Sequence, residues 1–185
     1  GRGAPVFIIH DEHGAWAEML RELVDSMARD KRQRLVLLEV GADEDAHSRA
    51  LLEAFSGLQY VGVASESAPQ LDMRADFGPH ASRARVHAAA PEAVAEAIPT
   101  EALDIVFLDL AAAVVGGRSA AQALDLWEAR VKPGGILAGR NFVPQQPDAL
   151  DDVCRRRFGN DIHVTMGGGF WWFVEPPEEE EQASA

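Results

Sequence analysis

Three apolar segments of this sequence each carry a carboxylate or a glycine turn at or near one end. They are Leu35–Val40, which Gly41 follows, Leu103–Asp109, and Val131–Gly139, which contains a Lys-Pro-Gly-Gly turn. Nearly unbroken aliphatic runs of this length are typical of parallel strands covered on both faces. Since open α/β sheets bind their ligands at the carboxyl ends of the strands, the pattern predicts a fold that holds a nucleotide-type cofactor.

Helical and strand patterns alternate along most of the chain. We expect helices near residues 16–27, 45–55, 91–97, 124–131 and 148–158. We expect seven strands, at residues 35–40 in the centre of the sheet, 59–64, about 85–88, 103–109, the segment that ends at 139, 163–166 and 170–174. The last two are separated by three glycines and form a hairpin. The predicted fold class is α/β, with a Rossmann-like, seven-stranded, mostly parallel sheet, helices on both faces and a C-terminal antiparallel hairpin.

The length of 185 residues suits one α/β domain, which we place at residues 1–174. Residues 175–185 include Glu178–Glu181 and lack apolar periodicity, so we expect a disordered acidic tail that aids solubility or docks on a basic partner. The net charge of −13 argues against a nucleic-acid partner. No apolar run reaches the roughly 18 residues that would span a bilayer, so we expect no membrane insertion.

The cysteine content bears on the compartment. Cys154 is the only cysteine, which excludes an internal disulfide and is compatible with a reducing compartment. Because the chain begins with Gly1 and not Met, we expect it to be processed, tagged or excised from a longer one, and a targeting segment could have been removed. The expected localisation is soluble and intracellular, either cytoplasmic or organellar.

Four features together resemble the class I S-adenosylmethionine-dependent methyltransferases. They are Val106–Asp109, a following helix with Leu126 and Trp127, the Lys-Pro-Gly-Gly turn before an aliphatic strand, and the closing Phe170–Val174. The resemblance covers nearly the whole chain and is nearest to the branch of small-molecule, sugar-type O-methyltransferases. It implies methyl transfer from S-adenosylmethionine to a small-molecule hydroxyl.

The resemblance also implies which residues hold the cofactor. An acidic residue and a glycine after the first strand let the backbone approach the methionine part of the cofactor, and Glu39 and Gly41 match them. Asp109 is placed near the reaction centre and implies a catalytic role and, together with the amide oxygen of Asn141, a divalent metal site. The cofactor-binding residues carried over are Glu39, Gly41, Ala42, Ser48, Ala64, Ser65, Ala88 and Asp109.

Other residues depart from the family pattern at positions where its chemistry is expected. Family members carry a second glycine in the cofactor loop, an acidic residue that binds the ribose, a glycine-aspartate pair near the adenine, and acidic or histidine residues near the reaction centre. This chain has Asp45, Ala64, Ala89, Ala112 and Arg140 there. Such a concentration gives comparable weight to a second hypothesis, a catalytically inactive pseudo-methyltransferase that serves as a structural or protein-interaction module. A small-molecule substrate is the partner expected of an active enzyme, and a protein is the partner expected of an inactive one.

Several polar or aromatic residues allow both a functional and a structural interpretation. Arg140 could bind an acidic group, but we expect a surface or ion-pair residue, and His87 could bind the ligand, but we expect it to be structural. The His10–His13 segment holds a metal or favours the start of the first helix, which we prefer. Since side chains alternate along a strand, we expect one of Trp171 and Trp172 to point into the core and the other outward, toward a ligand or a protein interface.

Overall fold

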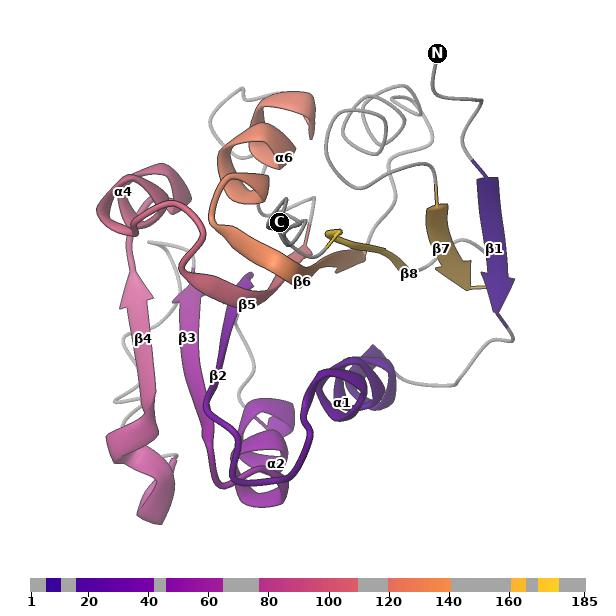
Figure 1. The fold of residues 1–185 in the computed structure, drawn as a ribbon. Helices are drawn as coiled ribbons and strands as arrows, with labels where there is room; N and C mark the ends of the chain where they lie inside the picture. The colour runs from indigo at the N-terminus through magenta and orange to yellow at the C-terminus, as the bar shows by residue number, and fades with distance from the viewer. Residues whose placement is uncertain are drawn as a thin grey trace, which may run out of the picture.

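The computed structural model describes residues 6–10, 16–41, 46–64, 77–109, 120–140, 161–165 and 170–176, which build one mixed sheet covered by helices (Figure 1). The sheet has eight strands in the order β1-β7-β8-β6-β5-β2-β3-β4. The strands are β1 (Val6–His10), β2 (Leu35–Val40), β3 (Leu58–Ala64), β4 (Ala84–Ala88), β5 (Leu103–Asp109), β6 (Val131–Arg140), β7 (Asp161–Thr165) and β8 (Phe170–Val174). The helices are α1 (Trp16–Met27), α2 (Ala46–Ala54), the 3-10 helix η1 (Gly78–Arg83), α4 (Pro91–Ala97) and α6 (Ala120–Glu128).

The predicted fold class is confirmed. All seven expected strands are present, and β8 pairs antiparallel with both β6 and β7, as the hairpin prediction requires. The remaining pairs are parallel. The eighth strand, β1, was not expected and pairs in parallel with β7 at the edge of the sheet.

Three details of the sequence interpretation change. The strand predicted as central, β2, is an interior strand, whereas the middle of the order falls on β6 and β5. Val131 is the first residue of β6 and not the end of the preceding helix. The helix expected near residues 148–158 and the segment 177–185 lie outside the described residues.

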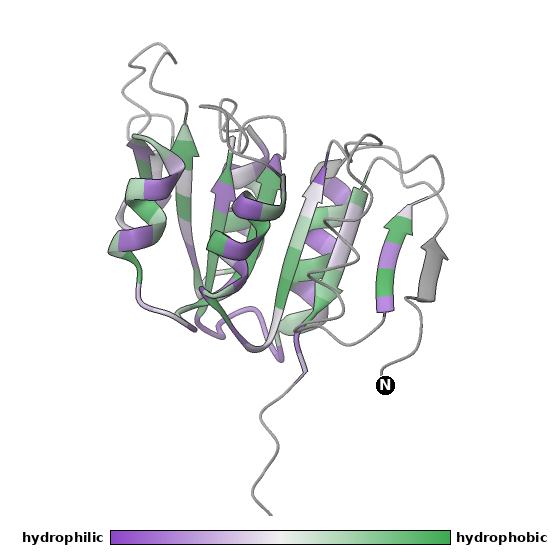
Figure 2. Cartoon of the chain, turned by 90° about the horizontal axis from the view of Figure 1, so that it is seen from above, coloured by the Kyte–Doolittle hydropathy of each residue, from purple (hydrophilic) through white to green (hydrophobic). Residues whose placement is uncertain are grey.

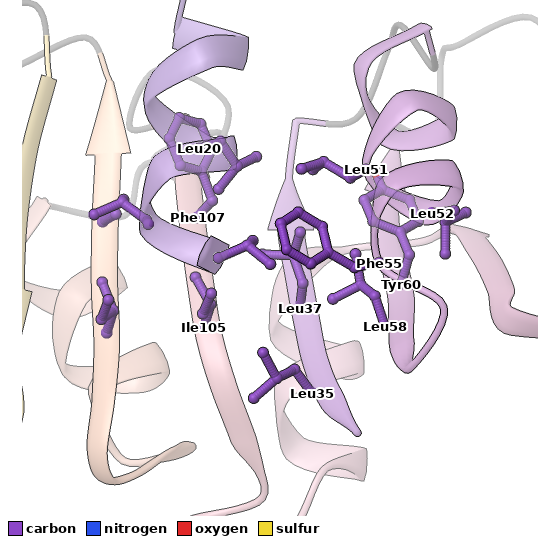
Figure 3. Close-up of a cluster of buried hydrophobic side chains, with 14 of the residues drawn as sticks. Leu20, Leu35, Leu37, Leu51, Leu52, Phe55, Leu58, Tyr60, Ile105 and Phe107 are labelled. Carbon is purple, nitrogen blue, oxygen red and sulfur yellow. The ribbon is translucent and has the colours of Figure 1, made fainter. Parts of the chain in front are cut away.

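Hydrophobic side chains fill both faces of the sheet. On one face, α1 and α2 pack against the strands through a cluster that includes Leu20, Leu52 and Phe107 (Figure 3). On the other face, α4 and α6 pack through a cluster that includes Ala95, Leu124 and Trp127. Seen from above, the strands are largely hydrophobic and the helices mix hydrophobic with hydrophilic residues (Figure 2). Burial on both faces explains why the strands read as continuous apolar runs.

Both tryptophans of β8 are buried, so the expectation that one of them points outward is wrong. Trp171 is 1% exposed and packs in the α4–α6 cluster, whereas Trp172 is 7% exposed and packs in the α1–α2 cluster. The two side chains do alternate, but β8 lies between β6 and β7 and both of its faces are covered. Trp172 also stacks on His163 of β7, with ring centroids 4.9 Å apart.

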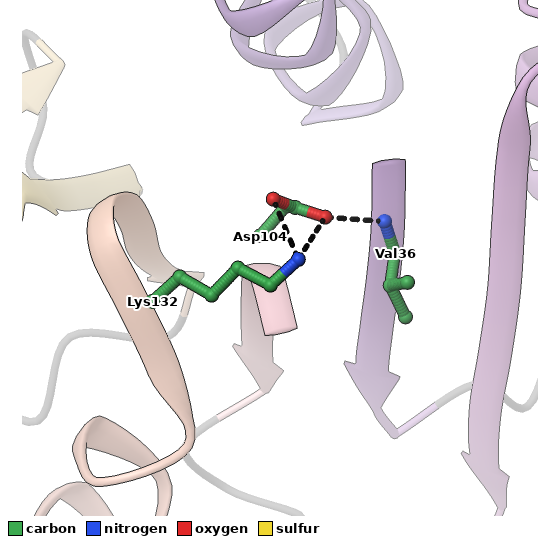
Figure 4. A network of polar contacts seen from close by, with 3 residues as sticks. All are labelled: Val36, Asp104 and Lys132. Atoms are coloured by element: carbon green, nitrogen blue, oxygen red, sulfur yellow. Dashed lines mark hydrogen bonds and ion pairs between the residues drawn. The ribbon is translucent and has the colours of Figure 1, made fainter. Parts of the chain in front are cut away.

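Polar contacts tie the strands together at the edge where β2 and β5 begin. One carboxylate oxygen of Asp104 accepts a hydrogen bond of 2.8 Å from the backbone N–H of Val36, and the ammonium group of Lys132 lies 3.4 Å from the other oxygen (Figure 4). Beyond β8, Glu175 and Pro176 continue along β6, because the Glu175 N–H donates to the Gly135 carbonyl and the Gly134 N–H donates to the Pro176 carbonyl. These contacts lie at the amino ends of the strands, whereas the predicted site residues lie at the opposite, carboxyl ends.

Candidate functional site

The sheet has a topological switch point between β2 and β5, where open α/β folds form a ligand crevice. From β2 the chain passes to β3 and β4 on one side and then returns to β5 on the other side of β2. In open α/β sheets, the point at which the strand order reverses in this way is where ligands bind, outside the carboxyl ends of the strands. Val40 is in register with Leu108, so the ends of β2 and β5 stand side by side. Glu39, Gly41 and Asp109 all lie at these two strand ends.

Gly41 turns the chain away from the end of β2. Its φ of 93° falls in the left-handed region, where residues with a Cβ are strained. Its N–H donates a hydrogen bond of 2.9 Å to the carbonyl of Val63, which anchors the turn to β3. The backbone at the rim of the crevice is thus held in a conformation that favours glycine.

Glu39 is buried near the end of strand β2, two residues before that glycine, and it is paired. The residue is 2% exposed, and its Oε2 lies 2.7 Å from Nε2 of His47 in the first turn of α2. Ser48, the next residue of α2, is fully buried. The structure therefore brings Glu39 together with the helix start that carries Ser48. The contribution of His47 was missed, because no spacing rule in the sequence links a strand residue to a histidine eight positions later.

Asp109 forms an ion pair with the residue beside it on β6. Asp109 and Arg140 are register partners, and Nη2 of Arg140 lies 3.2 Å from Oδ2 of Asp109. The interpretation of Arg140 as an ion-pair residue is confirmed. A guanidinium at this distance occupies the side of the carboxylate where a cation would bind, so the structure does not support the predicted metal site. Within the described residues, no group of three or more histidine, cysteine or acidic side chains could hold a metal ion.

The described positions expected to bind the ribose and the adenine, Ala64 and Ala88, offer only methyl groups. Ala64 ends β3 and Ala88 ends β4, and the two are in register. Ala64 is buried and Ala88 is exposed. His87, next to Ala88, is exposed as well. In the described part of this region, hydrogen bonds to a ligand must therefore come from the backbone or from His87.

Several predicted positions are outside the described residues. They are Ala42, Ser65 and Asn141 of the site, the departures Asp45 and Ala112, and residues 11–13 of the His10–His13 segment.

Comparisons with known proteins identify the fold. No protein-family model matches this sequence, and no curated protein is similar enough to it in sequence to count as a relative. Among solved structures, a protein described as an S-adenosylmethionine-dependent methyltransferase from Methanococcus maripaludis matches with a TM-score of 0.59 and 12% identity, over 93% of this chain and 99% of that one. A methyltransferase dependent on the same cofactor from Aquifex aeolicus matches with a TM-score of 0.56 and 13% identity, over 85% and 87% of the two chains.

Further neighbours belong to larger proteins. The precorrin-6y C5,15-methyltransferase from Geobacter metallireducens matches with a TM-score of 0.54 and 14% identity over 74% of this chain, which spans 69% of that one. This chain spans only 56% of the S-adenosylmethionine-dependent methyltransferase SibL. At such low identities the likeness establishes the fold and not the activity. The fold is that of the class I S-adenosylmethionine-dependent methyltransferases, and the O-methyltransferase branch is not confirmed.

The lengths and hydropathies of the helices bear on whether the chain could cross a membrane. None of those within the described ranges combines the length and the apolar character that crossing a membrane requires.

Proposed function

We propose that this chain binds S-adenosylmethionine across the carboxyl ends of β2 and β5 and transfers its methyl group to a small-molecule hydroxyl. The observation that carries the proposal is the position of Glu39 and Gly41. A buried carboxylate and a left-handed glycine stand at the one point where the strand order reverses, and that point is where this class of fold binds ligands. The structural neighbours support the choice of cofactor.

Each site residue has a role in this proposal. Glu39 accepts a hydrogen bond from the ammonium group of the methionine part, and Gly41 and Ala42 let the backbone approach that part closely. Ser48 supports the loop from the start of α2. Ala64 and Ser65 line the ribose, and Ala88 lies near the adenine. The methyl groups of Ala64 and Ala88 supply shape more than polar recognition.

The transfer itself needs little from the protein beyond orientation. When bound, S-adenosylmethionine supplies a methyl group on a sulfonium and leaves as a neutral thioether. The acceptor oxygen forms the new bond to carbon and loses its proton, and Asp109 is the carboxylate placed to accept that proton. Arg140 holds Asp109 in place at 3.2 Å. No metal takes part in this account.

The alternative is an inactive domain that serves as a structural or protein-interaction module. Two observations favour it. The ends of β3 and β4 carry Ala64 and Ala88, so among the described residues these two strand ends provide no carboxylate for the ribose. Oδ2 of Asp109 is already paired with the guanidinium of Arg140 at 3.2 Å. Both hypotheses share the fold, and they differ in whether the crevice binds the cofactor.

Calorimetric titration with S-adenosylmethionine and S-adenosylhomocysteine separates the two hypotheses. The proposal predicts micromolar dissociation constants for the wild type, and a loss of affinity of about 10-fold or more in Glu39→Gln, because one hydrogen bond to a charged group is removed. Glu53→Gln is the matched control, since Glu53 is an exposed carboxylate on α2. Absence of heat and of thermal stabilisation at millimolar ligand would favour the inactive module. If binding is found, tritium transfer to candidate hydroxyl compounds then tests catalysis.

A further inference from the structure

The histidine paired with Glu39 is not explained by packing alone. The side chains of His47 and Glu39 are 8% and 3% exposed, and Nε2 and Oε2 are 2.7 Å apart. An exposed ion pair contributes little and varies in geometry, but this one is held between β2 and the first turn of α2 inside the fold. A contact of this length between an imidazole nitrogen and a carboxylate is typical of a charge-assisted hydrogen bond.

Burial makes the orientation of this carboxylate depend on its donor. A buried charged or polar group costs free energy unless a hydrogen bond compensates for the lost water. Within the described part of the chain, the side chain of Glu39 has one hydrogen bond, the bond from His47, and this bond involves Oε2 only. Without it, the carboxylate would turn toward other donors or toward water. His47 therefore fixes the rotamer of Glu39.

The second carboxylate oxygen is the one left for a ligand. A carboxylate accepts hydrogen bonds at both oxygens, and the imidazole uses only Oε2. Glu39 stands two residues before Gly41, at the rim of the crevice between β2 and β5. A cationic group that enters this crevice beside the Gly41 turn would therefore meet the carboxylate of Glu39, whose orientation is fixed by His47 of α2.

We propose that His47 is a positioning residue: its Nε2–H holds Glu39 so that Oε1 of Glu39 accepts the ammonium group of the ligand's amino-acid part. The inference rests on the proposed function, because it assigns the amino group of S-adenosylmethionine to this carboxylate. It deepens that function by naming the residue that gives the crevice its selectivity for ligands with an amino-acid part over ligands that carry only the nucleoside.

Two substitutions at one position isolate the hydrogen bond. The amide nitrogen of glutamine matches the place of Nε2 of histidine, so His47→Gln retains a donor to Glu39. The asparagine side chain is one methylene shorter, so His47→Asn keeps a polar amide but withdraws the donor from Oε2. His80→Asn is the control for loss of an imidazole, since His80 lies in η1, which precedes β4 and is away from the carboxyl ends of β2 and β5.

The readout is a ratio of two affinities. S-adenosylhomocysteine carries the amino-acid part, and 5′-methylthioadenosine shares the nucleoside and the thioether but lacks the amino group and the carboxylate. Partial unfolding of a variant weakens the apparent binding of both compounds by the same factor, so the ratio of their dissociation constants reports only the contact to the amino-acid part.

We expect His47→Asn to weaken binding of S-adenosylhomocysteine by about 10-fold while binding of 5′-methylthioadenosine stays within about twofold. In His47→Gln and His80→Asn the ratio should stay within about threefold of the wild type. An unchanged ratio in His47→Asn, or an equal change in His47→Gln, would overturn the assignment of His47. If wild-type protein binds neither compound, the proposed function itself fails, and this outcome is distinct from failure of the positioning role.

Discussion

Arg140 and Asp109 stand directly opposite each other at the last register pair of β6 and β5, and their charged groups are 3.2 Å apart. Asp109, the candidate catalytic carboxylate, is the last residue of β5. The cation beside it is therefore a group of the protein itself, the guanidinium of Arg140. Arg140 departs from the family pattern, but it lies next to Asp109 at low electrostatic cost because the two side chains carry opposite charges.

The ion pair predicts a small effect on stability. Arg140 and Asp109 have side chains 29% and 16% exposed, so solvent screens their attraction. Arg140→Met should lower the free energy of unfolding by no more than about 1 kcal/mol, and Mg²⁺ should not raise the melting temperature of the wild type. Urea denaturation and thermal melts with and without Mg²⁺ measure these quantities. A marked stabilisation by Mg²⁺ would show that a cation does bind at this edge.

Gly41 should be required for both the turn and the ligand. With φ at 93°, alanine at this position should cost about 1–2 kcal/mol of stability. We also expect Gly41→Ala to weaken binding of S-adenosylhomocysteine, because the added Cβ stands where the backbone approaches the ligand.

Gly134 provides the matched control for Gly41. It also has a positive φ, 76°, and a Cβ built there meets no atom within 4 Å. It lies at the start of β6, away from the crevice. Gly134→Ala should therefore destabilise the fold by a similar amount and leave the dissociation constant unchanged. Equal loss of affinity in both variants would mean that Gly41 acts only through stability.

Gly139 should be required because Trp171 lies against it. A Cβ on Gly139 would be 2.2 Å from Cζ2 of Trp171, a distance that forces the indole or the strand to move. Gly139→Ala should cost about 1–3 kcal/mol. Trp171→Phe relieves the clash with the indole but not the 2.8 Å approach of the same Cβ to the Leu108 carbonyl oxygen, so the double variant should regain part of the loss and be more stable than the sum of the single effects predicts. Additive effects in a chemical-denaturation cycle would contradict this contact.

Arg83 should stabilise the end of α2. Its guanidinium donates hydrogen bonds to the carbonyls of Leu52, Phe55 and Leu58, at 2.7, 3.0 and 2.9 Å. The last carbonyls of a helix lack partners within the helix, so Arg83→Met should cost about 2–4 kcal/mol. Arg85→Met, at an exposed position on β4, should change stability by no more than about 0.5 kcal/mol. A similar small effect for both substitutions would show that water replaces the guanidinium.

The fold could be predicted from the sequence because its signals are local. Apolar runs such as residues 105–108 and the glycine turn at Gly134 specify buried strands and their connections without knowledge of distant residues. The strand β1 was missed because Val6–His10 pairs with Asp161–Thr165, at the other end of the chain, and a terminal run of five residues carries no connection signal. Burial of Trp172 was missed for a related reason, since it depends on which strands flank β8.

The site was harder to predict than the fold. Glu39 and Asp109 could be placed at strand ends from the sequence, but their partners could not. The pairing of Asp109 with Arg140 requires the register of two strands, and the pairing of Glu39 with His47 requires the angle at which α2 packs on the sheet. Local patterns determine neither quantity.

The most direct test of the central claim is the location of the bound ligand. Backbone amide resonances of ¹⁵N-labelled protein, recorded while S-adenosylhomocysteine is added, report which residues contact it. We predict that the shifts concentrate at Gly41, at residues 46–48 and near Asp109, along the carboxyl ends of β2 and β5. An absence of shifts at millimolar ligand, or shifts confined to the opposite edge around residues 29–34, would contradict the claim that this crevice is the cofactor site.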